Sequence, residues 1–357
     1  MTHAAPDTAA AGSAPPARYG LHVIDLDADV LVLGAGVIGL STAVCLAEAG
    51  VNVTVAAADP PERTTSVAAG AIWGPHLVGM DERVERWANA TLASLVSLSH
   101  PQLGANELAG VVHTTTGIAA SRESDASPPE VAATAGDLAA CSPGEVPPGY
   151  ACAWRLTATT VAMPGYLTYL AGRFGRAGGK SAFPAKIGGL SDASRLAPSA
   201  RVIVNCTGCG ARDLVPDPDV VPVRGQVVVA ANPGITEFFV GTGSDPADLT
   251  YVLPHGDVVV LGGTEQHGNW SLDADPDTAA RIIAACAAIE PALREATVLE
   301  HRVGLRPARS RVRLEAERLG GVTVVHNYGH GGAGVTLSWG CAEDAAELAL
   351  AALAQFP

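Results

Sequence analysis

A glycine-rich turn near the start of the chain has the spacing of a dinucleotide-binding fingerprint. Its residues are Gly34-Ala35-Gly36-Val37-Ile38-Gly39, between a short apolar run and a segment typical of a helix. The first glycine would permit a tight turn, the second a close pyrophosphate, and the third close packing of helix on strand. Asp59 stands about 20 residues further on, where an acid would bind ribose hydroxyls. This pattern predicts dinucleotide binding and leaves NAD and FAD open.

Five blocks of residues carry a more specific signal. The longest is His326-Asn327-Tyr328-Gly329-His330-Gly331-Gly332-Ala333-Gly334-Val335-Thr336-Leu337-Ser338-Trp339-Gly340-Cys341-Ala342. The others are Thr64-Thr65-Ser66-Val67-Ala68-Ala69-Gly70, Asn205-Cys206-Thr207-Gly208, Val223-Arg224-Gly225-Gln226 and Val303-Gly304-Leu305-Arg306-Pro307-Ala308-Arg309. Taken in their order along the chain, they resemble the D-amino-acid oxidase family, and the resemblance runs from residue 29 to the end. The resemblance implies FAD as the cofactor.

The resemblance also implies an anchor for a substrate carboxylate. Arg306 would bind the carboxylate, because a planar guanidinium can pair with it through two hydrogen bonds. Tyr251, in a strand of an inserted domain, would donate its hydroxyl to the same group. The alternatives are a structural ion pair between Arg306 and an acid such as Glu300, and a simple core position for Tyr251.

The C-terminal glycine loop has two implied tasks. The Gly332 carbonyl would accept a hydrogen bond from the substrate amine, and residues 334–336 would lie against the pyrimidine edge of the flavin. A helix N-terminus there would stabilise the negative charge of the reduced flavin. His330 lies in the same loop, but hydride transfer from the α carbon needs orientation and a neutral amine. We therefore do not assign it as a catalytic base.

These expectations give two sets of site residues and no metal site. The expected catalytic residues are Tyr251, Arg306 and Gly332. The expected FAD contacts are Gly34, Ala35, Gly36, Val37, Ile38, Gly39, Asp59, Thr64, Thr65, Ser66, Ala69, Gly70, Gly208, Arg306, Gly331, Gly332, Gly334, Val335 and Thr336. The C-x-x-C from Cys206 to Cys209 could be a redox dithiol or half a metal site. The resemblance favours a flavin-side loop instead, and no second C-x-x-C follows.

The elements around these residues predict two sheets. Apolar runs at 29–33, 51–55, 201–205 and 321–326 are typical of buried parallel strands, with helices expected at 41–49, 84–99 and 335–353. Alternating segments at 223–229, 250–253 and 258–261 predict an antiparallel sheet.

The fold expected is α/β: a Rossmann-like FAD-binding domain assembled from discontinuous segments, with an inserted, mainly antiparallel β substrate domain of α+β type. The FAD-binding domain would comprise residues 29–78, 155–219 and 301–357. The substrate domain would comprise 79–154 and 220–300. Residues 1–28, rich in Ala and Pro, would form a disordered extension.

The amino-acid composition limits the kinds of partner that we expect. With 22 Lys and Arg against 36 Asp and Glu, the formal net charge is -14, which disfavours nucleic acid and anionic membranes. Seven scattered cysteines and the absence of a signal-peptide pattern favour a reducing compartment. We expect a cytoplasmic enzyme whose partners are a small D-amino acid and oxygen, with a homodimer as a possible assembly.

The expected activity is oxidative deamination of D-amino acids to 2-oxo acids, with ammonia and hydrogen peroxide as the other products. Alternatives are a glycine or D-aspartate oxidase, a dehydrogenase with another electron acceptor, and a flavin-binding protein without turnover. An NAD-dependent dehydrogenase would leave the C-terminal block without a role. Some family members carry a second active-site tyrosine on a lid, and the matching segment 244–249 contains none.

Overall fold

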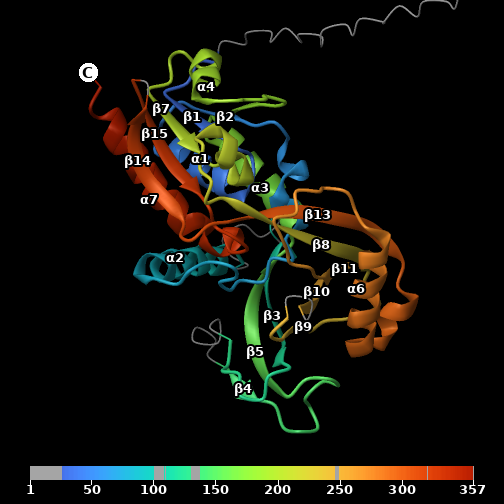
Figure 1. Cartoon of the computed structure of the whole chain (residues 1–357). Helices are drawn as coiled ribbons and strands as arrows, with labels where there is room; N and C mark the ends of the chain where they lie inside the picture. Colours follow the sequence, from blue (N-terminus) through green and yellow to red (C-terminus); the bar gives the residue numbers. More distant parts are fainter. Residues whose placement is uncertain are drawn as a thin grey trace, which may run out of the picture.

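Two β-sheets with helices packed against them make up the protein (Figure 1). The computed structural model describes residues 26–99, 108, 110–129, 137–245, 249–319 and 321–356. One sheet has six strands in the order β14-β15-β7-β1-β2-β6. The other has nine, in the order β12-β8-β11-β10-β9-β3-β5-β4, with β13 also paired to β8. The expected α/β fold with a second, mainly antiparallel sheet is confirmed.

The six-stranded sheet is parallel except for one edge strand. Its strands are β1 (Val30–Leu33), β2 (Val53–Ala56), β6 (Lys180–Ala182), β7 (Val202–Asn205), β14 (Arg313–Leu319) and β15 (Val322–Tyr328), with β14 antiparallel. Helices α1 (Val37–Glu48), α2 (Glu82–Ser99), α3 (Met163–Arg176) and α7 (Gly334–Leu353) contribute to the apolar core on one face, and α4 (Leu190–Leu196) packs on the other.

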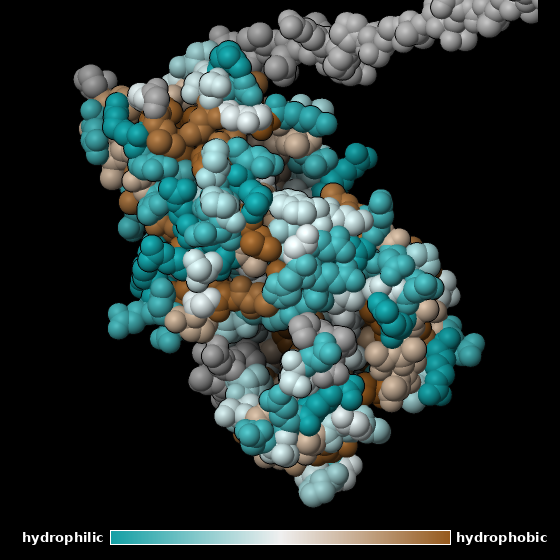
Figure 2. All heavy atoms as spheres, in the orientation of Figure 1, coloured by the Kyte–Doolittle hydropathy of each residue, from teal (hydrophilic) through white to brown (hydrophobic). Residues whose placement is uncertain are grey.

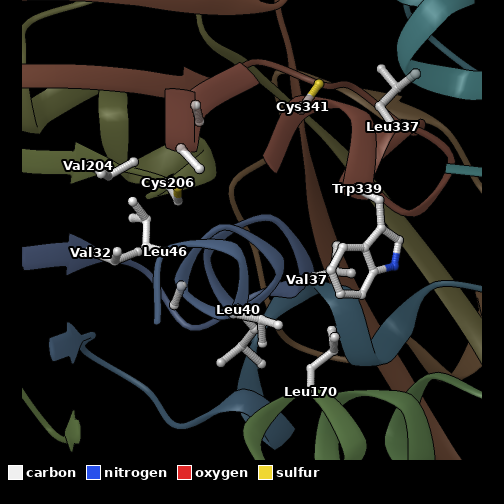
Figure 3. Packing of buried hydrophobic residues seen from close by; sticks show 14 of the residues in the cluster. Val32, Val37, Leu40, Leu46, Leu170, Val204, Cys206, Leu337, Trp339 and Cys341 are labelled. Atoms are coloured by element: carbon white, nitrogen blue, oxygen red, sulfur yellow. The ribbon is translucent and has the colours of Figure 1, made fainter. Parts of the chain in front are cut away.

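Alternation of side chains along these strands fills both faces of the sheet. Val32 and Val204 point to the α1 side, whereas their neighbours Leu31 and Ile203 belong to the cluster around α4. Figure 3 shows Val32 and Val204 on one side of α1, with Leu170 and Trp339 on its far side. Helix α1 is therefore buried between the sheet and the helices α3 and α7.

The nine-stranded sheet is antiparallel except where β3 pairs with β9. Its strands are β3 (Val112–Ser121), β4 (Ala139–Ala140), β5 (Cys152–Val161), β8 (Val221–Ala231), β9 (Phe238–Thr242), β10 (Thr250–His255), β11 (Val258–Gly262), β12 (Gln266–His267) and β13 (Val298–Ala308). Helix α6 (Pro276–Ile289) covers one face, where Val228 and Val252 meet Ile282. The opposite face carries the second half of the candidate site.

Short helices connect these elements. They are η1 (Pro61–Arg63), η2 (Thr65–Ala68), η4 (Gly208–Gly210), α5 (Ala211–Leu214) and η6 (Pro291–Glu295).

Helix α1 starts earlier than expected from sequence, and two of the expected domain boundaries fall within strands. Helix α1 begins at Val37 rather than near residue 41, because the fingerprint itself forms the first turn, with Leu40 N–H bonded to the Gly36 carbonyl at 2.9 Å. The expected boundaries at 155 and 301 fall inside β5 and β13, which both belong to the nine-stranded sheet. Helix α2, expected in the substrate domain, packs on α7 and belongs to the core of the six-stranded sheet.

Residues 26–28, placed at the end of the expected extension, are hydrogen-bonded to the rest of the protein. The Leu26 N–H donates to the Leu196 carbonyl at 3.0 Å, and the Ala28 N–H donates to Ser199 Oγ at 3.1 Å. These bonds tie residues 26–28 to the end of α4 and the turn after it. Residues 1–25 lie outside the described residues.

Hydrophilic side chains cover most of the face seen in Figure 2, with small hydrophobic patches between them. In the part of the chain that the structure describes, no helix is both long and apolar enough to cross a membrane. Nor do the described His, Cys, Asp and Glu residues form a cluster of three or more that could hold a metal ion.

The contact between α2 and α7 depends on a glycine. A Cβ on Gly340 would lie 2.4 Å from the Trp87 Cα and 2.5 Å from its carbonyl oxygen. We expect Gly340→Ala to lower the free energy of unfolding by about 1 to 3 kcal/mol, because backbone must move to admit the methyl group. Gly175→Ala, at an exposed helical position with open space around it, should instead be neutral or slightly stabilising. Urea unfolding of both variants in the same excess of FAD measures the difference, and equal midpoints would contradict this packing.

Candidate active site

The outer glycines of the fingerprint are fixed by backbone contacts. Gly34 has φ +108°, and a Cβ there would lie 2.4 Å from the Cys206 carbonyl oxygen at the end of β7. A Cβ on Gly39 would lie 1.9 Å from the Gly34 carbonyl oxygen. Only glycine fits at either position, since neither backbone oxygen can move aside without breaking the turn. These two residues hold α1 tightly against β1 and β7.

Gly36 differs from these two glycines, because a side chain there would meet other side chains and not backbone. A Cβ there would meet only Ser66 Oγ at 3.1 Å and Thr64 atoms at 3.9 Å or more. Ser66 Oγ accepts a hydrogen bond from the Val37 N–H at 2.9 Å, at the start of α1. The block around Ser66 therefore lies against the fingerprint turn.

The N-termini of α1 and α7 adjoin at this point. A Cβ on Gly334, the first residue of α7, would lie 3.9 Å from Val37 Cγ1 in the first turn of α1. Neither helix has an acidic residue in its first turn, although the chain as a whole is strongly acidic and α2, α4 and α6 do carry one there. Two uncompensated helix N-termini create a positive potential suited to a bound anion.

Within the described ranges, Asp59 makes no polar contact that links it to the fingerprint turn. It lies exposed, three residues beyond the end of β2, and among the described residues its side chain makes no hydrogen bond or ion pair. Thr64 turns its hydroxyl to the Pro61 carbonyl oxygen at 2.8 Å. The ribose role of Asp59 stays a prediction.

Strand β13 reaches the fingerprint side through Thr65. Thr65 Oγ1 lies 3.3 Å from both the N and the O of Leu305. One residue before, a Cβ on Gly304 would lie 3.1 Å from Thr65 Cγ2 and 3.2 Å from the Ala68 Cβ. Side chains alternate along a strand, so Gly304 and Arg306 share the face of β13 that looks towards η2.

Arg306 is held over a glycine of the neighbouring strand. A Cβ on Gly225 would lie 2.6 Å from Arg306 Nη1, so the guanidinium occupies the space that a side chain would take. Arg306 Nη1 donates to the Thr264 carbonyl oxygen at 2.8 Å. Glu300, the acid considered from sequence, pairs with Arg302 at 2.7 Å instead. The guanidinium thus keeps hydrogen-bonding capacity for an anion.

Tyr251 lies beside this guanidinium. Its ring fills the space left by three glycines, since a Cβ on Gly262 would lie 2.0 Å from its Cζ, on Gly263 2.7 Å from Cε1, and on Gly70 3.1 Å from Cε2. Burial raises the pKa of the Tyr251 phenol, and the charge and hydrogen bond of Arg306 only partly oppose this. The hydroxyl therefore stays protonated at neutral pH and can donate a hydrogen bond.

The C-terminal glycine loop packs on residues 76 and 77. Gly331 has φ +55°, and the Gly332 N–H donates to the His76 carbonyl oxygen at 3.0 Å. Thr336 Oγ1 donates to the Gly74 carbonyl oxygen at 2.8 Å, which joins the first turn of α7 to the same segment. His330 is buried, and burial lowers the pKa of its imidazole to about 3. A group so hard to protonate is a poor general base.

The other chemically suggestive residues have structural partners. Burial raises the pKa of the Cys206 and Cys209 thiols to about 12, so neither is a ready thiolate for redox chemistry. Arg224 is buried and bonded to Gln226 and Gln266, while Arg309 pairs with Asp217 at 3.1 Å. Neither arginine is available to a substrate side chain.

Two residues at the site were missed from sequence. Glu265 follows Thr264, the residue that binds Arg306, and its carboxylate pairs with His76 Nε2 at 2.7 Å. The His76 ring lies against the glycine loop, because a Cβ on Gly332 would lie 2.4 Å from its Cδ2. Neither residue belongs to the blocks that carried the sequence analysis, and only the fold brings them to Arg306.

Two surface cavities of about 490 and 840 Å³ lie elsewhere. The smaller is lined by residues 140–154, and the larger by residues of α4, the α5 region and β14 and β15. Neither contains a predicted site residue. Volume alone does not point to the site, which is recognised by its charges and backbone cradle.

Comparison with protein families decides the class. A family model described as FAD dependent oxidoreductase matches residues 29–348. The chain belongs to this family. FAD is therefore the cofactor of this oxidoreductase, in agreement with the glycine cradle and the paired helix N-termini described above.

Two curated relatives are close to this oxidoreductase over almost their whole length. A D-amino-acid oxidase of Rubrobacter xylanophilus is 45% identical over 328 residues, which are 91% of this chain and 97% of the relative. A D-amino-acid oxidase of Streptomyces coelicolor is 44% identical over 326 residues, with coverages of 90% and 97%. Among solved structures, the glycine oxidase of Geobacillus kaustophilus superposes with a TM-score of 0.75 at 18% identity, covering 91% of this chain and 95% of that one. This last likeness concerns the fold.

The position of Gly36, bordered by side chains and not by backbone, gives a test of the cofactor cradle. Gly36→Val should remove FAD from the purified protein, because the side chain would occupy the space where a pyrophosphate meets the backbone. Only Ser66 and Thr64 border that space, so the variant should still fold. Absorbance of flavin released from equal amounts of protein measures retention, with Gly144→Val in an open turn as the control. A folded Gly36→Val protein with a full complement of FAD would refute the cradle.

Proposed function

We propose that this oxidoreductase is a D-amino-acid oxidase. A D-amino acid would lose its α hydrogen as hydride to FAD, and the resulting imino acid would take up water to give a 2-oxo acid and ammonia. Oxygen would accept the two electrons and become hydrogen peroxide. The close relatives named as D-amino-acid oxidases support this reaction.

The observation that carries the proposal is the pairing of Arg306 with Tyr251. A guanidinium with free donors and a protonated phenol, side by side on one sheet face, make a specific receptor for a carboxylate. This face looks towards η2 and the fingerprint turn, which contain residues proposed to bind the cofactor. An amino acid anchored by its carboxylate would therefore lie between the sheet and the cofactor.

The residues proposed to hold FAD come from both glycine-rich segments. The bound flavin supplies the acceptor for two electrons and a proton, which no side chain of the site can supply. We propose that the turn from Gly34 to Gly39, with Ser66, receives the pyrophosphate at the N-terminus of α1. Residues 334–336 would meet the flavin ring at the N-terminus of α7.

Catalysis then depends on orientation. Arg306 and Tyr251 would fix the carboxylate, and the Gly332 carbonyl would accept a hydrogen bond from the amine. Two fixed groups on the α carbon leave its hydrogen a single direction, which supplies the alignment that hydride transfer needs. No general base is assigned, in keeping with the buried, neutral His330.

The alternatives are weighed by the same contacts. A D-aspartate oxidase would need a further cation for the substrate side chain, and Arg224 and Arg309 are both engaged elsewhere. A glycine oxidase, a dehydrogenase using another acceptor, and a flavin protein without turnover are separated by assay. The domain boundaries, a homodimer and a cytoplasmic location stay predictions. The expected lid segment falls partly on residues 246–248, outside the described residues.

The stereochemistry of the site gives the first test. D-alanine in air should yield hydrogen peroxide, whereas L-alanine should not, because its side chain would point into the flavin when both anchors are engaged. A peroxide-coupled assay with both enantiomers measures this directly. Comparable turnover of the two would refute the site, and turnover of D-alanine without peroxide would favour a dehydrogenase.

The two anchoring side chains should differ in energy. Removing Arg306 should cost on the order of 3 to 5 kcal/mol in kcat/KM for D-alanine, since the carboxylate would be left unpaired, whereas Tyr251→Phe should cost about 1 kcal/mol. Arg306→Lys should restore only part, because an ammonium lacks the planar fork. Oxygen uptake by FAD-loaded variants measures the effects, with Arg155→Ala, an exposed arginine paired with Glu237, as control. Near-normal kcat/KM for Arg306→Ala would place the carboxylate elsewhere.

A further inference from the structure

Glu265 is a charged group at the site that the proposed mechanism does not use. Its side chain is only 11% exposed, and His76 Nε2 lies 2.7 Å from its carboxylate. Burial alone would raise the pKa of this carboxyl group, but the hydrogen bond and charge of His76, with Arg306 and His267, hold it below its usual range. Glu265 is therefore an anion at neutral pH.

The backbone on both sides of Glu265 is fixed. Thr264 Oγ1 accepts a hydrogen bond from the Gln226 N–H at 2.9 Å, and the Thr264 carbonyl accepts from Arg306. Gln266 Oε1 accepts from Arg224 Nη1 at 2.9 Å. Because its neighbours in the chain are tied to β8 and β13, the carboxylate is preorganised rather than free to swing into solvent.

The position of Glu265 relates it to both substrate anchors. Glu265 directly follows Thr264, whose carbonyl oxygen accepts a hydrogen bond from Arg306, so it lies next to the expected carboxylate anchor. Through His76 it also adjoins Gly332, the expected anchor of the amine. The His76 side chain is 40% exposed, so solvent reaches the His76–Glu265 pair. A substrate held between the two anchors would send its side chain towards this pair.

We propose that Glu265 forms a side-chain subsite that receives the cationic end of basic D-amino acids such as D-lysine. This inference rests on the proposed oxidase function. An ammonium or guanidinium bonds a carboxylate strongly, so a basic side chain can replace or join the His76 imidazole on Glu265. The same carboxylate repels acidic side chains, and it thereby weighs against D-aspartate and D-glutamate as substrates.

A second role for the carboxylate is possible in chemical terms, because the α-ammonium of every amino acid is also a cation. The two roles differ in what they predict. A carboxylate that binds the α-ammonium affects all substrates alike, whereas a side-chain subsite affects substrates according to the charge of their side chains. Ratios of kcat/KM between substrates of similar shape separate these cases, and they do not depend on the fraction of active enzyme.

The test compares wild type with Glu265→Gln on two matched pairs of substrates. D-lysine is measured against D-norleucine, and D-glutamate against D-glutamine, in the peroxide-coupled assay with FAD content checked for each preparation. Loss of the charge should lower the first ratio about tenfold and raise the second by a similar factor. A general packing defect cannot move the two ratios in opposite directions. Glu237→Gln, at an exposed glutamate paired with Arg155, serves as the matched control and should change neither ratio.

Unchanged ratios in Glu265→Gln would overturn the subsite, and so would an equal fall in kcat/KM for all four substrates. Wild-type enzyme that oxidises D-alanine but prefers D-norleucine to D-lysine would also overturn it while leaving the proposed function intact. If wild type oxidises neither D-alanine nor a single one of the four other substrates, the proposed function is overturned, and this inference with it.

Discussion

Arg306 lies over Gly225 because β13 pairs with β8 in one register, which sets Gly304 opposite Gly225 and Arg306 opposite Val223. A slip of one residue would turn Arg306 to the α6 side of the sheet and remove the proposed carboxylate anchor. The register continues across the sheet, from Arg302 through Val227 and Gly262 to Tyr251. Cross-strand partners share a face, so one pairing pattern puts both anchoring side chains on the side that looks towards η2.

Glycines provide the space that the side chains of the candidate site occupy. Gly225 makes room for a guanidinium, and Gly262 and Gly263 make room for a phenol ring, so each stands where backbone must approach a larger group. Gly36 is proposed to do the same for a pyrophosphate. Glycines of this kind can be recognised in the sequence where they lie in a local motif. The cofactor turn, the strands around it and α7 were predicted from local pattern and family resemblance, because strand, turn and helix there follow one another directly along the chain.

Features that depend on distant pairing could not be predicted in this way. The sequence pattern predicts no strand over 298–308, and residues from 301 onward are expected in the FAD-binding domain. Only pairing with β8 assigns β13 to the nine-stranded sheet. Helix α2 has an apolar face, and the partner of that face, α7, lies some 250 residues away. Glu265 and His76 are ordinary polar residues in sequence, and they gain meaning only through the Thr264 and Gly332 contacts that bring them to Arg306.

The proposed function requires that Arg306 and Tyr251 hold the substrate carboxylate while the α hydrogen faces the flavin. The most direct test mixes the FAD-loaded enzyme anaerobically with D-alanine or with D-alaninamide and follows bleaching of the flavin absorbance. D-alaninamide keeps the α carbon and the amine but replaces the carboxylate with a neutral amide, which cannot form the charge-assisted pair of hydrogen bonds with a guanidinium. The proposed function predicts that D-alanine bleaches the flavin rapidly. At equal concentration, D-alaninamide should bleach it more slowly by at least about a hundredfold. Equal rates with the two compounds would contradict it.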